Sequence, residues 1–74
     1  MTPMQRYLIV IEPTPTGFSA FSPDVAGCVA TGATETDTEA NMREALAFHL
    51  DRLREEGASV PEPGARATYV EVAG

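Results

Sequence analysis

The sequence predicts an α+β fold with the order β-β-β-α-β along the chain. Short runs that are rich in β-branched and aromatic residues, or that alternate between apolar and polar positions, are typical of strands. One longer run repeats its apolar residues every three or four positions, which is typical of a helix. A single helix covers only one face of a sheet, so we expect two layers: an antiparallel-rich sheet with one helix on one face.

The first predicted strand covers Arg6–Glu12 and ends before Pro13. Alternate side chains of a strand point to opposite faces. Tyr7, Ile9 and Ile11 therefore share one face, and Leu8 and Val10 share the other. Because both faces are apolar, we expect a central strand, or an edge strand that a second subunit covers.

Turn residues separate the next two predicted strands, Phe18–Ser22 and Cys28–Gly32. The segment 13–17 holds two prolines and a glycine, so the first two strands form a hairpin. A second break follows at 23–27, where we expect a positive φ at Gly27. The residues to which we assign structural roles in turns are Gly17, Pro23, Gly27 and Gly32.

The helix is predicted from one apolar stripe, formed by Met42, Ala45, Leu46, His49, Leu50 and Leu53. Thr34 or Thr36 can supply the N-cap oxygen, and Asp37 lies in the first turn, where the helix dipole favours negative charge. Gly57 supplies the end of the helix.

The chain after the helix is predicted to be a loop over Ala58–Ala65, which is rich in proline and glycine, and then a fourth strand over Thr68–Val72. Residues 1–74 thus form one predicted domain, without a C-terminal DNA-binding domain. Leu, Ile, Val and Phe number only 15 of 74 residues. A core this small leaves little net stability, and nothing within the chain covers the second face of the sheet. We therefore expect a homo-oligomer, a dimer or a tetramer.

The charge balance of 5 basic and 11 acidic residues gives a net charge of −6. Such a surface repels phosphate backbones and attracts basic proteins, so direct nucleic-acid binding is disfavoured. One cysteine and one histidine do not make a zinc site, and we expect neither a metal nor a cofactor. We expect no membrane span, and the lone thiol fits the cytoplasm.

Three motifs in fixed order resemble the N-terminal domain of HicB-type antitoxins. A Gly-aromatic strand, Gly17–Phe21, leads into Pro-Asp-x-x-Gly-Cys at 23–28; Gly-x-Thr follows at 32–34, and Asn41–Leu46 holds an Asn and a Glu-Ala-Leu. The resemblance covers roughly residues 5–72. It implies a partly degraded RNase H-like fold without nuclease activity, which binds HicA, a small basic toxin that cleaves mRNA. The chain departs from the family in having Asp37-Thr38 where Glu-Ala is common, and in ending where many members continue into a DNA-binding domain.

We predict partner contacts at Tyr7, Phe18, Phe21 and Asp24. Phe18 and Phe21 are three residues apart and therefore face opposite sides of a strand. One packs under the helix, and the other lies on the uncovered face. Asp24 either accepts local backbone N–H groups in an Asx turn or meets a cationic group of the partner.

The leading hypothesis is therefore a non-enzymatic, antitoxin-like module that covers the active face of a HicA-type toxin. The alternative is a stand-alone homo-oligomeric scaffold, or a small-ligand-binding protein, with the same fold and no toxin partner. A third hypothesis, a metal-dependent nuclease, requires Glu12, Asp24, Asp37 and Glu39 to converge. Cys28 is expected to be a small buried apolar residue rather than a nucleophile.

Overall fold

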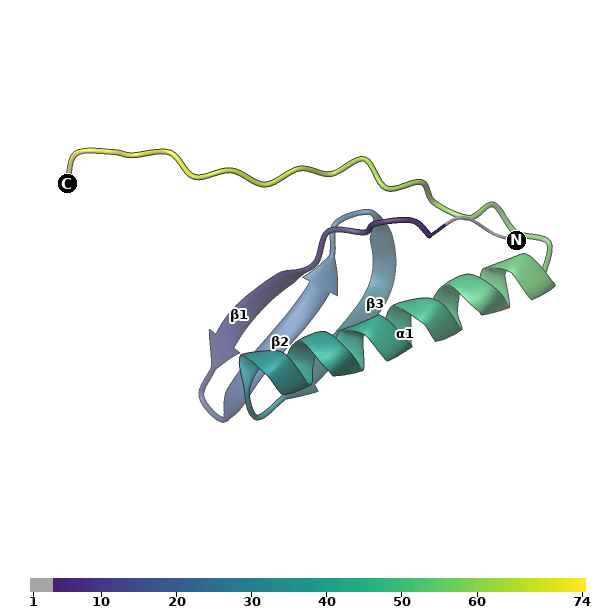
Figure 1. Ribbon diagram of the computed structural model, residues 1–74, viewed down its shortest axis with the longest axis horizontal. Helices are drawn as coiled ribbons and strands as arrows, with labels where there is room; N and C mark the ends of the chain where they lie inside the picture. Colours follow the sequence, from purple (N-terminus) through teal and green to yellow (C-terminus); the bar gives the residue numbers. More distant parts are fainter. Residues whose placement is uncertain (1–3) are drawn as a thin grey trace.

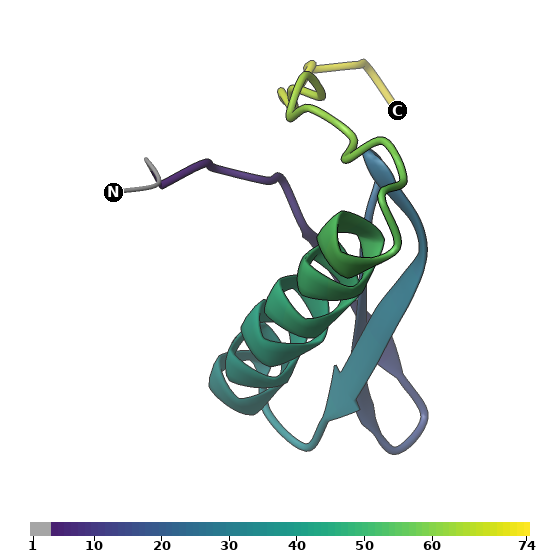
Figure 2. The ribbon, with the colours of Figure 1, turned by 90° about the vertical axis from the view of Figure 1, so that its right-hand side faces the viewer.

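The computed structural model describes residues 4–74 and contains a three-stranded sheet and one helix (Figure 1). The elements are strands β1 (Val10–Thr14), β2 (Gly17–Ser22) and β3 (Val25–Gly32) and helix α1 (Glu35–Glu55). The strands are antiparallel in the order β1-β2-β3, and α1 lies on one face of them (Figure 2). The predicted α+β layers, with one helix on one face, are confirmed.

The sheet register shows why β3 begins earlier than predicted. Ser22 pairs with Val25, so the break is a tight turn of two residues. The next pair is Phe21 with Val29, which leaves residues 26–28 of β3 as a bulge. Gly27 has a φ of 79° inside this bulge, a value that suits glycine.

A small core joins the sheet to the helix. Its buried apolar residues come from β2, β3 and α1, and they are Ala20, Val25, Cys28, Met42, Leu46 and Leu50. Tyr7, Ile9 and Ile11 pack against this core and are only partly buried. The side of the core next to β1 is therefore incompletely covered.

The start of the helix lies close to the end of β3. A Cβ atom at Gly32 would come within 2.6 Å of the hydroxyl of Thr38, and one at Gly17 would collide with the carbonyl oxygen of Gly32. Thr38 is fully buried, and its hydroxyl donates to the carbonyl of Thr34 at 2.7 Å. Both glycines are thus required by close approach: Gly32 to the first turn of the helix, and Gly17 to the backbone at the end of β3.

Both ends of α1 are capped as the sequence predicts. The hydroxyl of Thr34 accepts the amide N–H of Asp37 at 3.0 Å, so Thr34 is the N-cap rather than Thr36. At the other end Gly57 has a φ of 70°. The amides of Gly57 and Ala58 donate to the carbonyls of Arg54 and Leu53 at 3.1 and 2.9 Å, which is a Schellman motif.

Three predictions about strands are wrong. The first strand does not end before Pro13: β1 continues through it to Thr14, because an edge strand tolerates the missing N–H of a proline. The first strand begins at Val10 instead of Arg6, because Val10 pairs with Phe21 near the end of β2 and residues 6–9 have no paired strand beside them. The predicted fourth strand, Thr68–Val72, does not form. This segment extends away from the sheet (Figure 1), because an alternating sequence favours extended backbone but a strand also needs a neighbouring edge.

Candidate partner-binding surface

The face of the sheet that α1 leaves uncovered carries an apolar row across all three strands. Val10, Phe21 and Val29 are paired side by side. Phe21 is 40% exposed and Val29 is 67% exposed. An exposed aromatic residue beside an aliphatic one is typical of association surfaces, so this outer row is a candidate contact site.

The neighbouring row on the same face is polar. It consists of Glu12, Ser19 and Thr31, which are paired across the sheet. Glu12 and Thr31 are exposed. The outer face therefore combines an apolar row with a negative charge on β1.

Phe18 and Phe21 lie on opposite faces, as the sequence predicts. Phe18 has the same parity along β2 as the buried Ala20 and is half-buried on the helix side. Phe21 lies on the outer face. Only Phe21 of this pair is presented to a partner there.

Asp24 has a role that neither sequence interpretation included. Its carboxylate accepts the amide N–H of Gly64 at 3.2 Å and that of Ala65 at 3.1 and 3.2 Å. These groups are distant in sequence, so this is not a local Asx turn. Asp24 binds the chain that follows the helix to the β2–β3 turn.

Tyr7 makes a second contact of the same kind. Its ring is half-buried, and its hydroxyl donates to the carbonyl of Pro61 at 2.6 Å. The structure therefore brings Tyr7 and Asp24 to the segment 61–65, not to the outer apolar row.

Within the strands and the helix, sequence reasoning missed two exposed large apolar residues. Val29 belongs to the outer row. Its neighbour Cys28 is buried, and successive residues of a strand face opposite sides, so the expected burial of Cys28 indicates that Val29 is exposed. Phe48 is 67% exposed on α1, and it falls two positions after Leu46, off the apolar stripe of the helix.

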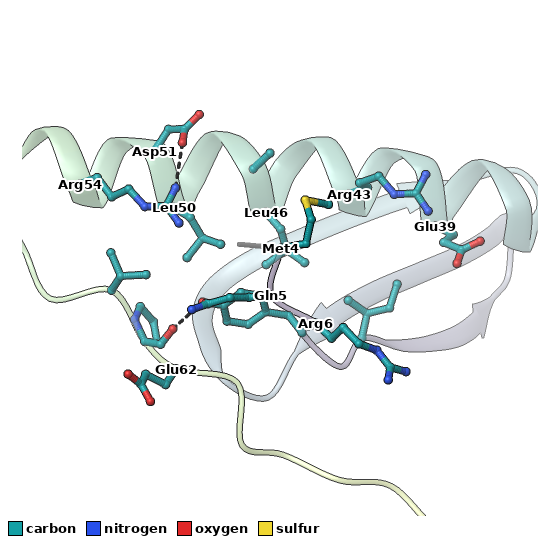
Figure 3. Close-up of a pocket in the computed structure, with 15 residues that line it drawn as sticks. Met4, Gln5, Arg6, Glu39, Arg43, Leu46, Leu50, Asp51, Arg54 and Glu62 are labelled. Carbon is teal, nitrogen blue, oxygen red and sulfur yellow. Dashed lines mark hydrogen bonds and ion pairs between the residues drawn. The ribbon is translucent and has the colours of Figure 1, made fainter. Parts of the chain in front are cut away.

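A groove of about 830 Å³ lies between α1 and the chain that leads into β1 (Figure 3). Ile9, Leu46, Leu50 and Val60 form its apolar part. Charged groups of α1 also line it, among them Asp51 and Arg54, which form an ion pair at 3.0 Å. The groove opens where the sheet stops at β1.

The structure gives no support to the nuclease hypothesis. Within residues 4–74, no group of three or more His, Cys, Asp or Glu side chains could hold a metal ion. Cys28 is buried, as expected, and burial raises the pKa of its thiol, which disfavours the nucleophilic thiolate. No helix in this part of the chain is long and apolar enough to cross a membrane.

Comparison with known proteins gives a consistent result. A family model described as "HicB_like antitoxin of bacterial toxin-antitoxin system" matches residues 7–73. A chain in a solved structure titled "HicA3 and HicB3 toxin-antitoxin complex" is 38% identical, with a TM-score of 0.70 over 81% of this chain and 70% of that chain. The structure "Antitoxin HicB3 crystal structure" is 40% identical, with a TM-score of 0.66 over 77% of this chain and 42% of that chain.

A protein of Haemophilus phage HP1, described as an uncharacterized 14.9 kDa protein in the rep-hol intergenic region, is 31% identical over 64 residues. The match covers 86% of this chain and 48% of the phage protein. The chain thus spans about half the length of this relative.

Proposed function

The chain belongs to the HicB-like antitoxin family of bacterial toxin-antitoxin systems, and on that premise we propose that it is a toxin-binding domain without enzymatic activity. It neutralises a small basic HicA-type toxin by covering the face with which the toxin cleaves mRNA. The observation that carries this proposal is the similarity, at 38% identity, to a chain of a toxin-antitoxin complex.

Charge supports a basic partner. The chain has a net charge of −6, and two of its five basic residues, Arg52 and Arg54, are already paired with the nearby acids Glu56 and Asp51. An acidic surface attracts a basic protein over several ångströms and accelerates their encounter. A toxin that binds RNA presents such a basic face.

Charge accelerates the encounter, and the outer face of the sheet supplies the apolar contact that holds the two proteins together. Binding energy at protein interfaces concentrates in a few buried side chains, and aromatic residues are prominent among them. Phe21 and Val29 form an exposed apolar centre, and Glu12 lies one row away on the same face. We place the toxin on this face.

The test is to co-express the chain with the short basic protein encoded by the neighbouring reading frame and to measure their affinity and the RNA cleavage that remains. Phe21→Asp should weaken binding at least about 10-fold, because it places a charge at the apolar centre. Cleavage should return in parallel.

Phe48→Asp is the matched control, because it makes the same exchange at an exposed aromatic on the opposite layer. It should leave affinity within about 2-fold, as substitutions outside the energetic centre of an interface do. Equal losses for the two variants would contradict the proposed face. If the basic protein does not bind at all, the toxin-neutralising function is wrong, and the stand-alone oligomeric scaffold gains support.

A further inference from the structure

The end of the chain is a strand-forming segment without a strand to pair with. Thr68–Val72 alternates between polar and apolar residues, yet Tyr69 is fully exposed, Val70 is 79% exposed and Val72 is 84% exposed. No backbone–backbone hydrogen bond within residues 4–74 involves this segment. Three exposed apolar side chains on an unpaired strand sequence are unfavourable in water.

The segment also lies outside the body of the molecule. The radius of gyration is 14.2 Å, whereas a compact chain of this length has about 11 Å. Figure 1 shows the segment extending well beyond the sheet. Its base is fixed by the contacts of Pro61 with Tyr7 and of Ala65 with Asp24, so the extension begins from a defined point.

The same chain has an unfilled place for a strand. Among the described residues β1 pairs only with β2, so its other edge has free N–H and C=O groups. The groove between α1 and the chain that leads into β1 lies where that chain enters the strand (Figure 3), and Ile9 and Leu50 are among the residues that line it. A further strand next to β1 would extend the sheet and cover the groove.

The segment matches this place in length and in pattern. It has five residues, as β1 does. In a strand, Thr68, Val70 and Val72 share one face, and Tyr69 lies on the other. The valines suit the apolar part of the groove, and Tyr69 would then continue the outer row beyond Val10.

We propose that Thr68–Val72 of each copy pairs with the free edge of β1 in a second copy and covers the groove there. Within one chain the segment runs past the sheet and does not lie beside β1 (Figures 1 and 2). When two copies related by a two-fold axis exchange the segment, each segment pairs with the β1 edge of the other copy. No free β1 edge or unpaired segment then remains, so the assembly is a closed dimer. This exchange does not depend on a toxin.

The test measures the mass of the full chain in solution by light scattering after gel filtration. The wild type should be a dimer. Val70→Pro removes a strand N–H and disfavours pairing, and Ala47→Arg places a long charged side chain in the groove from an exposed helical position. Each variant alone should be a monomer with an unchanged helical circular dichroism signal.

A mixture of the two variants distinguishes strand exchange from other modes of dimerisation. The Val70→Pro chain has an open groove, and the Ala47→Arg chain has an intact segment, so the mixture should form a heterodimer. The matched controls are Ala73→Pro, beyond the strand, and Ala40→Arg, on α1 outside the groove lining; both should remain dimers.

Four results would overturn the proposal. These are a monomeric wild type, a dimeric Val70→Pro protein, a dimeric Ala47→Arg protein, and a mixture of the two variants that stays monomeric. A dimeric Val70→Pro protein would assign self-association to another surface, such as the outer apolar row. A dimeric Ala47→Arg protein would indicate that two segments pair with each other.

Discussion

The carboxylate of Asp24 connects two parts of the chain that are distant in sequence, because it accepts the amides of Gly64 and Ala65. Asp24→Ala should speed hydrogen exchange at these two amides and lower the free energy of unfolding by at least about 1 kcal/mol, since a typical hydrogen bond contributes about 1 kcal/mol and one to a charged group contributes more. Asp24→Asn keeps one acceptor oxygen and should lose less.

The matched control for Asp24 is Asp51→Ala. Asp51 is an exposed acid whose only polar contact among residues 4–74 is the ion pair with Arg54. Exposed ion pairs contribute little, so its removal should cost less than about 0.5 kcal/mol. Equal costs for the two variants would mean that Asp24 does not hold the segment after the helix.

Burial raises the pKa of the Cys28 thiol, which gives the free energy of unfolding a defined pH dependence. The unfolded thiol loses its proton near pH 8.5, whereas the folded thiol retains it at that pH. The unfolded state therefore binds fewer protons above this pH, and the stability that Cys28 provides is complete below it and declines as the pH rises.

The measurement is the urea midpoint of the wild type and of Cys28→Ala between neutral pH and about pH 10, where the buried thiol still holds its proton more tightly than the unfolded one. The alanine variant is less stable at neutral pH because it leaves a small cavity. The difference between the two proteins should shrink as the pH rises. A constant difference would show that the thiol titrates alike in the folded and unfolded chains.

At the scale of elements, the N-cap of α1 offers a test with an internal control. Thr34→Ala should lower the free energy of unfolding by about 1 kcal/mol, because the amide of Asp37 loses its acceptor. Thr34→Ser should restore most of it. Thr36 is an exposed residue in the first turn of the helix and is not the cap, so the thermal melt of Thr36→Ala should give a stability within about 0.5 kcal/mol of the wild type.

Elements differ in how well the sequence predicts them. The helix and both its caps depend on residues within one or two turns of one another, so the apolar stripe, Thr34 and Gly57 were sufficient. Strands depend on distant partners. The sequence of Arg6–Ile9 favours a strand, but β2 turns at Pro23 and leaves it unpaired, and Thr68–Val72 has no adjacent edge in its own chain.

The candidate site follows the same rule. The opposite orientations of Phe18 and Phe21 follow from strand parity, which the sequence alone supplies. The contacts of Asp24 with Gly64 and of Tyr7 with Pro61 join parts of the chain that no local pattern connects. Such contacts require knowledge of where the chain runs after the helix.

At the scale of the whole molecule, two kinds of force should leave separate signatures in toxin binding. The net charge of −6 is spread over the surface, so it acts during approach and is screened by salt. The contact of Phe21 acts only after docking, so it governs how long the complex lasts. Raising the ionic strength and mutating Phe21 should therefore change different rate constants.

The association rate constant of the wild type with the basic toxin should fall at least about 10-fold when the ionic strength rises from 0.01 to 0.15 M, since the screening length shrinks from about 30 to 8 Å. The dissociation rate constant should change less than about 2-fold. Phe21→Asp should mainly raise dissociation. Stopped-flow measurements separate the two constants, and an association rate constant that does not depend on salt would contradict a role for the acidic surface in toxin recognition.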